Sequence, residues 1–371
     1  KIVATLPFKL TKSQIDAVKE ITSDMSSNNR MHRLLQGDVG SGKTLVALLT
    51  MIHAVEGGAQ AVLLAPTEIL ARQHLSTIKH LINSEDVNVA LLTGRDKGKR
   101  RKEILEDLAQ GKINIAIGTH AIFQDGVNFK ALAYAVIDEQ HRFGVHQRLA
   151  LTSKGKSVDI LVMTATPIPR TLTLTAYGDM EVSRLLEKPA GRIPIDTRTM
   201  SINKIEDIVQ GLKRALNKNK KIYWVCPLIE ESEKLDLAAA EDRYAHLKSI
   251  FGSQVGLVHG KMKVSEKDAS MYSFKNGTVN ILVATTVIEV GVDVPEASIM
   301  IIEHAERFGL AQLHQLRGRI GRGIDKSTCI LMFTDNLTEM ARKRLEIMRK
   351  TEDGFIISEE DLRLRGAGEI L

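Results

Sequence analysis

The sequence predicts an α/β protein made of two tandem lobes, each with a parallel sheet covered by helices. Short apolar runs of strand length alternate with helix-length amphipathic segments through most of the 371 residues. The runs are apolar on both faces, as expected for strands buried in a parallel sheet. The alternation restarts after residues 188–194, which contain two prolines and a glycine. A chain of this length is also too long for one ordinary domain.

Each lobe has its own series of predicted strands. In the first lobe a strand at 33–36 leads into a glycine-rich loop and a helix at 45–55, and further strands follow at 61–65, 114–118, 134–138 and 160–163. The strands predicted in the second lobe are 221–226, 255–258, 281–284, 298–302 and 329–333. We therefore expect lobes at 1–192 and 193–340, followed by a short helical and loop segment at 341–371. The acidic stretch 230–242 is interpreted as a solvated insertion.

Composition favours a polyanionic partner. The net charge is +6 and the sequence pI is about 9.1, so lysines and arginines can displace counterions from phosphates. Aromatic residues make up 4%, which favours contacts to the phosphate backbone over base stacking. Two cysteines, both in apolar runs, predict buried thiols rather than a disulfide framework or a zinc site. We expect a cytoplasmic protein without a membrane segment.

A phosphate-binding loop follows the first predicted strand. The pattern Gly-x4-Gly-Lys-Thr at 37–44 has a strand before it and a helix after it, which is the context of a P-loop rather than of an ordinary glycine-rich turn. Glycines let backbone N–H groups converge on phosphate oxygens at a helix N-terminus. The lysine is expected to pair with the β- and γ-phosphates of ATP, and the threonine to bind Mg²⁺. The predicted ATP-binding residues here are Gly37, Gly40, Ser41, Gly42, Lys43 and Thr44.

Two carboxylates end the strand predicted at 134–138. Asp138 and Glu139 would lie at the carboxyl edge of the sheet, where ligands bind in open α/β folds. We expect Asp138 to hold Mg²⁺, partly through water, and Glu139 to orient and deprotonate the attacking water. The alternative is a solvated strand end.

Positive charge for the transferred phosphoryl group is predicted in the second lobe. Residues 315–322 place three arginines around two glycines, and Arg319 and Arg322 are candidate arginine fingers. We expect ATP to lie between the lobes, with these arginines approaching it from the second lobe. The alternative is a basic helix on a DNA-facing surface.

In this order the motifs resemble those of superfamily 2 helicases and translocases, and closely those of the RecG branched-DNA translocases. Residues 8–14 look like the adenine-reading Q motif, and 37–44 and 138–141 like motifs I and II. The other segments similar to helicase motifs are 66–74, 93–95, 118–121, 164–170, 284–295 and 315–322. Residues 166–172, 307–315 and 361–369 are shared by RecG proteins and transcription-repair coupling factors, whereas 138–145 and 353–359 are more similar to RecG.

This resemblance implies two RecA-like lobes, ATP and Mg²⁺ as cofactors, and DNA as partner. It also implies that Gln14 reads adenine, that Gly291 and Asp293 contact the nucleotide, and that Thr164 and Thr166 couple the ATP site to the DNA track. The residues implied to bind DNA are Thr67, Arg95, Thr119, His120, His259, Lys261 and Thr285. A monomer that works with single-strand-binding or replication-fork proteins fits the same resemblance.

The expected activity is ATP-driven translocation on branched DNA, such as stalled forks and Holliday junctions, in recombination and repair. Two alternatives remain open. One is a duplex translocase of the coupling-factor type. The other is a catalytically silent nucleic-acid-binding module, against which the intact Lys43, Glu139 and Arg322 argue. Because RecG proteins carry a wedge domain before the Q motif, we expect this chain to be the motor core of a longer protein.

Overall fold

The computed structural model describes residues 6–82, 87–139, 157–165, 180–189, 192–227, 233–285, 294–323 and 325–366. The chain divides into two compact units, Lys1–Pro189 and Ala190–Leu371, called unit 1 and unit 2 below. None of the described helices combines the length and the apolar character needed to cross a membrane.

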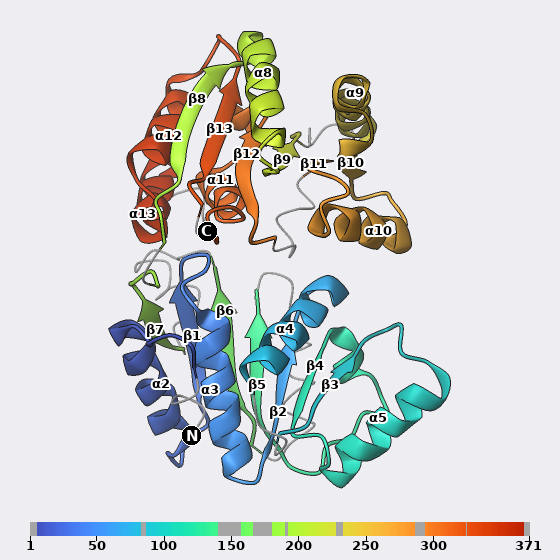
Figure 1. The fold of residues 1–371 in the computed structure, drawn as a ribbon. Coiled ribbons are helices and arrows are strands. Elements are labelled where there is room, and N and C mark those ends of the chain that lie inside the picture. Colours follow the sequence, from blue (N-terminus) through green and yellow to red (C-terminus); the bar gives the residue numbers. More distant parts are fainter. Residues whose placement is uncertain are drawn as a thin grey trace. The chain divides into compact units, whose positions relative to one another are not determined.

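Unit 1 is built on a seven-stranded sheet in the order β3-β4-β2-β5-β6-β1-β7 (Figure 1). All described pairs of neighbouring strands are parallel. The strands are β1 (His32–Gly37), β2 (Gln60–Leu64), β3 (Val89–Leu92), β4 (Ile115–Gly118), β5 (Leu132–Asp138), β6 (Asp159–Thr164) and β7 (Glu181–Leu185). The helical elements are α2 (Lys12–Met25), α3 (Lys43–Glu56), α4 (Glu68–Leu81), α5 (Gly98–Gln110) and the 3₁₀ turn η1 (His120–Phe123).

Unit 2 repeats this plan with a six-stranded sheet in the order β10-β11-β9-β12-β13-β8. Its described strand pairs are again parallel. The strands are β8 (Asp196–Ser201), β9 (Lys221–Val225), β10 (Val255–Val258), β11 (Ile281–Ala284), β12 (Ala297–Ile302) and β13 (Thr328–Phe333). The α-helices are α8 (Ile205–Leu216), α9 (Glu233–Phe251), α10 (Val264–Lys275), α11 (Leu310–Arg317), α12 (Glu339–Lys350) and α13 (Gly354–Arg365), and the 3₁₀ turns are η3 (Ile202–Lys204), η4 (Gly252–Gln254) and η6 (Ala305–Arg307).

Both faces of each sheet are buried, which explains why the strands are apolar throughout. In β1, Leu35 faces the core shared with α2, α3 and α4, whereas Leu34 faces the core that α5 covers. In β9, Tyr223 faces the core of α10 and α11, and Trp224 faces that of α8 and α9. This two-sided alternation in parallel sheets confirms the predicted α/β class with two tandem lobes.

The interpretation of residues 230–242 as a solvated insertion is only partly right for the residues that the structure describes, because Ala238, Ala239, Glu241 and Asp242 are exposed but Ala240 is buried. Residues from Glu233 onward begin α9, and both Ala240 and Leu247 are fully buried in the core of unit 2. This part of α9 therefore packs on the core through Ala240, while its acidic residues Glu241 and Asp242 face solvent. Three strands, β3, β7 and β8, were not predicted from the sequence.

Candidate nucleotide and nucleic-acid site

The predicted phosphate-binding loop connects β1 to α3, and two of its glycines are required by the geometry. Gly42 has a φ of 89°, and a Cβ atom there would lie 2.3 Å from Nε2 of Gln14. A Cβ atom on Gly37 would lie 2.4 Å from Oγ of Ser41. The side chains of Gln14 and Ser41 therefore occupy the space that a Cβ atom would need at these two positions, which is why the turn requires glycine there.

Lys43 lies over this loop. Its Nζ donates hydrogen bonds to the carbonyl oxygens of Gly37, at 2.7 Å, and Asp38, at 3.0 Å. Ser41 is 1% exposed, and its buried hydroxyl has no hydrogen-bond partner among the described residues. A buried polar group of this kind calls for a ligand or water. A loop with an ammonium group, an unsatisfied hydroxyl and glycine-lined backbone at the start of α3 fits a nucleotide phosphate chain.

Gln14 supports the loop from α2. It is the third residue of α2 and forms a capping box with Thr11, whose N–H donates to Oε1 of Gln14 at 3.0 Å. This contact turns Nε2 of Gln14 toward the loop, where it donates to the carbonyl oxygen of Ser41 at 2.8 Å. Gln14 is 3% exposed. Its described hydrogen bonds therefore join α2 to the loop, and contact with adenine stays a prediction.

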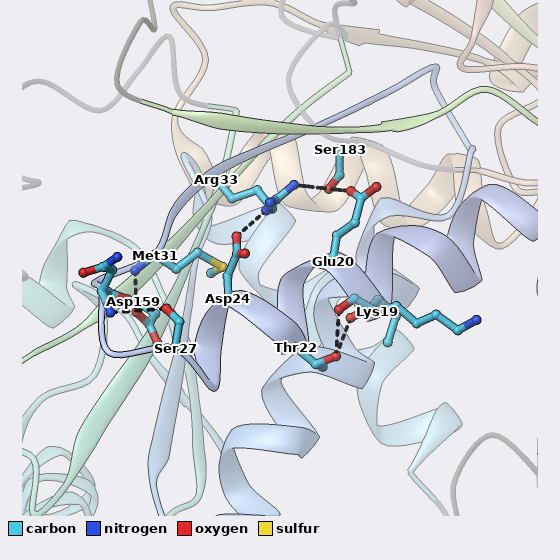
Figure 2. A network of polar contacts seen from close by, with 11 residues as sticks. Lys19, Glu20, Thr22, Asp24, Ser27, Met31, Arg33, Asp159 and Ser183 are labelled. Atoms are coloured by element: carbon cyan, nitrogen blue, oxygen red, sulfur yellow. Dashed lines mark hydrogen bonds and ion pairs between the residues drawn. The ribbon is translucent and has the colours of Figure 1, made fainter.

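The other end of α2 is anchored by a buried arginine. Figure 2 shows Arg33 of β1 reaching the acidic side chains of α2 and a serine of β7. Its Nε donates to Asp24 at 2.7 Å, and its Nη1 donates to Ser183 at 2.9 Å and lies 3.3 Å from Glu20. Because Arg33 is 7% exposed, this charge is stabilised by its partners rather than by water. The network fixes α2 against β1, and so fixes the helix that carries Gln14.

Asp138 ends β5 and Glu139 follows it, at the same sheet edge as the loop. The register pairs Asp138 with Met163 of β6, and Thr164 of β6 with Gln36 of β1. With neighbouring strands about 4.8 Å apart, Asp138 lies roughly 10 Å across the edge from the loop. Oδ2 of Asp138 lies 2.7 Å from Nε2 of His74 on α4.

The backbone of Glu139 is left-handed, with a φ of 55°. A non-glycine residue in this region costs about 1–3 kcal/mol and is typical of functional sites. Its N–H donates to the carbonyl oxygen of Met163 at 3.0 Å, and its Oε1 accepts from the N–H of Ala165 at 3.3 Å. Glu139 is thus tied to the end of β6, next to Thr164.

The described part of the chain offers a metal ion a small set of side-chain ligands. The described residues contain no group of three or more His, Cys, Asp or Glu side chains that could hold one. The hydroxyl of Thr44 and the carboxylate of Asp138 are hard oxygen ligands. A hard cation such as Mg²⁺ keeps several waters and binds through one or two protein groups and the phosphates, so this donor set fits it.

The candidate nucleic-acid residues of unit 1 occupy the other half of the same edge. Thr67 follows β2, Arg95 follows β3, and Thr119 and His120 follow β4. Thr67 caps α4 by accepting from the N–H of Leu70 at 3.3 Å. Arg95 and His120 are exposed, whereas Thr119 is 5% exposed.

In unit 2 the candidate nucleic-acid residues follow two adjacent strands. His259 comes directly after β10 and Thr285 directly after β11, and the N–H of Thr285 donates to the carbonyl oxygen of Val258 at 3.3 Å. Nδ1 of His259 and Oγ1 of Thr285 are buried and have no hydrogen-bond partner among the described residues. Burial lowers the pKa of His259, which favours a neutral imidazole that can donate or accept. Lys261 is exposed nearby in sequence.

The three arginines of residues 315–322 have different environments. Arg317 is 2% exposed, and its Nη1 donates to the carbonyl oxygen of Met348 at the end of α12, at 2.6 Å. It therefore joins α11 to α12. Arg319 and Arg322 are half-buried, and Nε of Arg322 donates to the carbonyl oxygen of Gly318 at 3.1 Å. The three arginines lie close together in the sequence. In the structure Arg317 packs between two helices, whereas Arg319 and Arg322 stay candidate arginine fingers.

Some predicted residues lie outside the described part of the chain, namely Thr166, Gly291 and Asp293. Conversely, His74 was not predicted as a site residue. The sequence pattern that could have indicated this residue is a histidine on the same helix face as Ala71 and Ile78, which lie three and four positions away.

Two family models match the chain. The model of DEAD/DEAH box helicases matches residues 11–175, and that of the helicase conserved C-terminal domain matches residues 203–323. Together with the two parallel-sheet units, these matches define the class: the chain belongs to the superfamily 2 helicases and has two RecA-like units. A structure of Mss116p bound to single-stranded RNA and AMP-PNP, with a TM-score of 0.71 at 19% identity over 94% of this chain and 74% of that one, has the same fold.

Within this class the chain belongs to the RecG family. It is 53% identical over its whole length to the ATP-dependent DNA helicase RecG of Bacillus subtilis (strain 168), and 51% identical to that of Escherichia coli (strain K12). A structure of RecG bound to a three-way DNA junction matches 99% of this chain and 48% of that one, with a TM-score of 0.86 and 43% identity. The chain spans 54% of the length of both curated relatives.

Proposed function

We propose that this chain is the ATP-driven motor of a DNA helicase or translocase that acts on branched DNA, such as stalled forks and Holliday junctions, in recombination and repair. One observation carries the proposal: a single sheet edge of unit 1 has the phosphate-binding loop and the Asp138-Glu139 pair on one half and Thr67, Arg95 and Thr119 on the other. The names of the relatives supply the substrate class.

The proposed chemistry assigns a role to each charged group near the loop. Lys43 leaves its loop carbonyls to neutralise the β- and γ-phosphates of ATP, while Thr44 and Asp138 hold Mg²⁺, partly through water. The metal ion would supply charge neutralisation at the phosphates. Glu139 orients the attacking water and accepts its proton. Gln14 holds the loop in shape and is available to adenine.

Unit 2 contributes the remaining proposed roles. We assign Arg319 and Arg322 to the negative charge that develops during phosphoryl transfer. We assign His259, Lys261 and Thr285 to DNA phosphates, supported by the two unsatisfied buried atoms at the ends of β10 and β11. Outside the described residues, Gly291 and Asp293 stay proposed nucleotide contacts.

The division into working parts is also proposed. Residues 1–192 and 193–340 would be the two lobes, and 341–371 a translocation segment. The packing of α11 against both α12 and α13 supports this last assignment, because α11 leads directly to Arg319 and Arg322. We further propose a cytoplasmic monomer that cooperates with single-strand-binding or replication-fork proteins.

The test is phosphate release from ATP in the presence of a three-way DNA junction, a linear duplex and single-stranded RNA. We expect the junction to stimulate hydrolysis most, and Lys43→Ala to abolish the stimulated rate. Equal stimulation by linear duplex would instead support a duplex translocase of the coupling-factor type. Stimulation by RNA alone would point to an RNA helicase, and a flat response to all three would indicate a silent binding module.

A further inference from the structure

His74 is the described residue that links α4 to the proposed metal-binding carboxylate. The buried residues of α4 are Ala71, His74 and Ile78, a spacing that places them on one helix face. His74 is 8% exposed, and its Nε2 lies 2.7 Å from Oδ2 of Asp138. A polar ring in an apolar stripe needs a polar partner, and Asp138 supplies it.

The first turn of the same helix carries groups of the proposed DNA track. Thr67 is the N-cap of α4. Glu68 is the next residue, and its Oε2 lies 2.8 Å from Nε of Arg95. His74 lies seven positions after Thr67, which is two helical turns or about 10 Å along the axis. One short helix therefore has proposed DNA contacts at its start and the partner of Asp138 two turns later.

The buried face of α4 packs into the core of unit 1. Ala71 and Ile78 are fully buried in the core that also contains Val136 of β5. Packed interiors transmit displacement because they contain few voids. A shift of the first turn of α4 would thus displace the imidazole of His74, and with it the oxygen of Asp138 that the imidazole holds.

We propose that His74 is a positioning residue that couples DNA at the start of α4 to the orientation of the Asp138 carboxylate, and so to binding of the metal–nucleotide complex. This inference rests on the proposed function, because it needs DNA at Thr67 and Arg95 and nucleotide at the loop. The contact takes one carboxylate oxygen and leaves the other for the cation. Coupling of this kind is reciprocal: if DNA changes nucleotide affinity, nucleotide changes DNA affinity by the same factor.

The experiment measures equilibrium binding of a fluorescent ADP derivative to the whole chain at several Mg²⁺ concentrations, with and without a three-way DNA junction. In the wild type we expect DNA to change the nucleotide affinity by a factor within about 5–150. In His74→Leu, DNA should change the nucleotide affinity by no more than about twofold. The Mg²⁺ concentration needed for half-maximal binding should rise by about tenfold. His74→Gln, which retains a side-chain N–H donor, should recover most of both effects.

His80→Leu is the matched control, because it makes the same substitution on an exposed position of the same helix. It should leave both readouts at wild-type values. Glu68→Gln should lower the DNA-dependent factor while leaving the Mg²⁺ dependence measured without DNA unchanged, since it acts only at the first turn. Thermal unfolding of each variant shows whether unit 1 is intact.

The outcomes separate this inference from the proposed function. If DNA does not stimulate phosphate release by the wild type, the proposed function fails. If the wild type responds to DNA and a folded His74→Leu keeps the full DNA-dependent factor, the coupling inference is overturned. A changed Mg²⁺ dependence with an unchanged DNA-dependent factor also overturns it, since His74 would then only orient Asp138.

Discussion

Removing Arg243 should destabilise unit 2 more than neutralising its partner does. Glu303 follows β12 and is 6% exposed, and its carboxylate accepts from Nε and Nη2 of Arg243 on α9 and from Nε1 of Trp224. The guanidinium also lies 5.5 Å from the centre of the Trp224 ring. Arg243→Met leaves a buried carboxylate without its counter-charge, which costs about 3–5 kcal/mol, and loses a cation–π contact of about 1 kcal/mol.

Glu303→Gln should cost less, at about 1–2 kcal/mol. The amide oxygen still accepts from Trp224, and the side chain of Arg243 is 19% exposed, so its charge can be hydrated. Combining both substitutions should be less destabilising than Arg243→Met alone, because no uncompensated buried charge remains.

The single tryptophan of the chain makes this measurable. Trp224 is fully buried in unit 2, so its fluorescence during urea unfolding reports that unit. With a slope of about 2 kcal/mol per molar urea, a loss of 4 kcal/mol lowers the midpoint by about 2 M. The reasoning is refuted if Glu303→Gln lowers the midpoint as much as Arg243→Met, or if the double variant is the least stable of the three.

The other predictions concern the loop, the arginines and a helix interior. Lys43→Ala should abolish ATP hydrolysis, measured by phosphate release, because the phosphates lose their cation. Arg322→Ala should reduce the hydrolysis rate by about 10³ or more with nucleotide binding largely intact; equal loss of both would make it a binding residue. Gly42→Ala should weaken nucleotide binding by about tenfold or more, because a Cβ atom meets Gln14 and a positive φ costs about 1–2 kcal/mol. Gly211→Ala, in the interior of α8 with open space around it, should instead raise stability by about 0.5–1 kcal/mol, seen in the same urea titration.

The strands missed by sequence patterns share a place in the sheets. β3 and β7 are the two edge strands of unit 1, and β8 is an edge strand of unit 2. An edge strand is covered less completely, and β7 and β8 accordingly mix polar and apolar side chains. β3 is apolar throughout but has only four residues, so it gives a weaker signal. β8 has the sequence Asp-Thr-Arg-Thr-Met-Ser and no fully buried residue. The central strands were predictable because two-sided burial leaves a continuous apolar run.

For the candidate site, the sequence predicted what depends on local spacing. The loop at 37–44 and the Asp138-Glu139 pair are contiguous segments, so their residue types identify them. The contact between His74 and Asp138 joins positions 64 residues apart, and it depends on how α4 lies against β5. Spacing along the chain contains no such information. The left-handed backbone of Glu139 was likewise not predictable, because nothing in an Asp-Glu pair requires it.

The strand order of unit 1 places two kinds of chemistry on one edge. β6 lies between β5 and β1, so the end of β6 touches both the carboxylate strand and the loop strand. β2 lies between β5 and β4, so helix α4, which follows β2, starts among the candidate DNA residues and runs beside the carboxylate strand. The proposed function places nucleotide and DNA on separate groups of this edge, and coupling between them requires an element that both ligands bias. Neighbouring strand ends lie only about 5 Å apart, so a single side chain can bridge the two halves. The contact of His74 with Asp138 crosses the boundary between the two halves of that edge, which is why its loss should separate DNA binding from nucleotide binding without removing either.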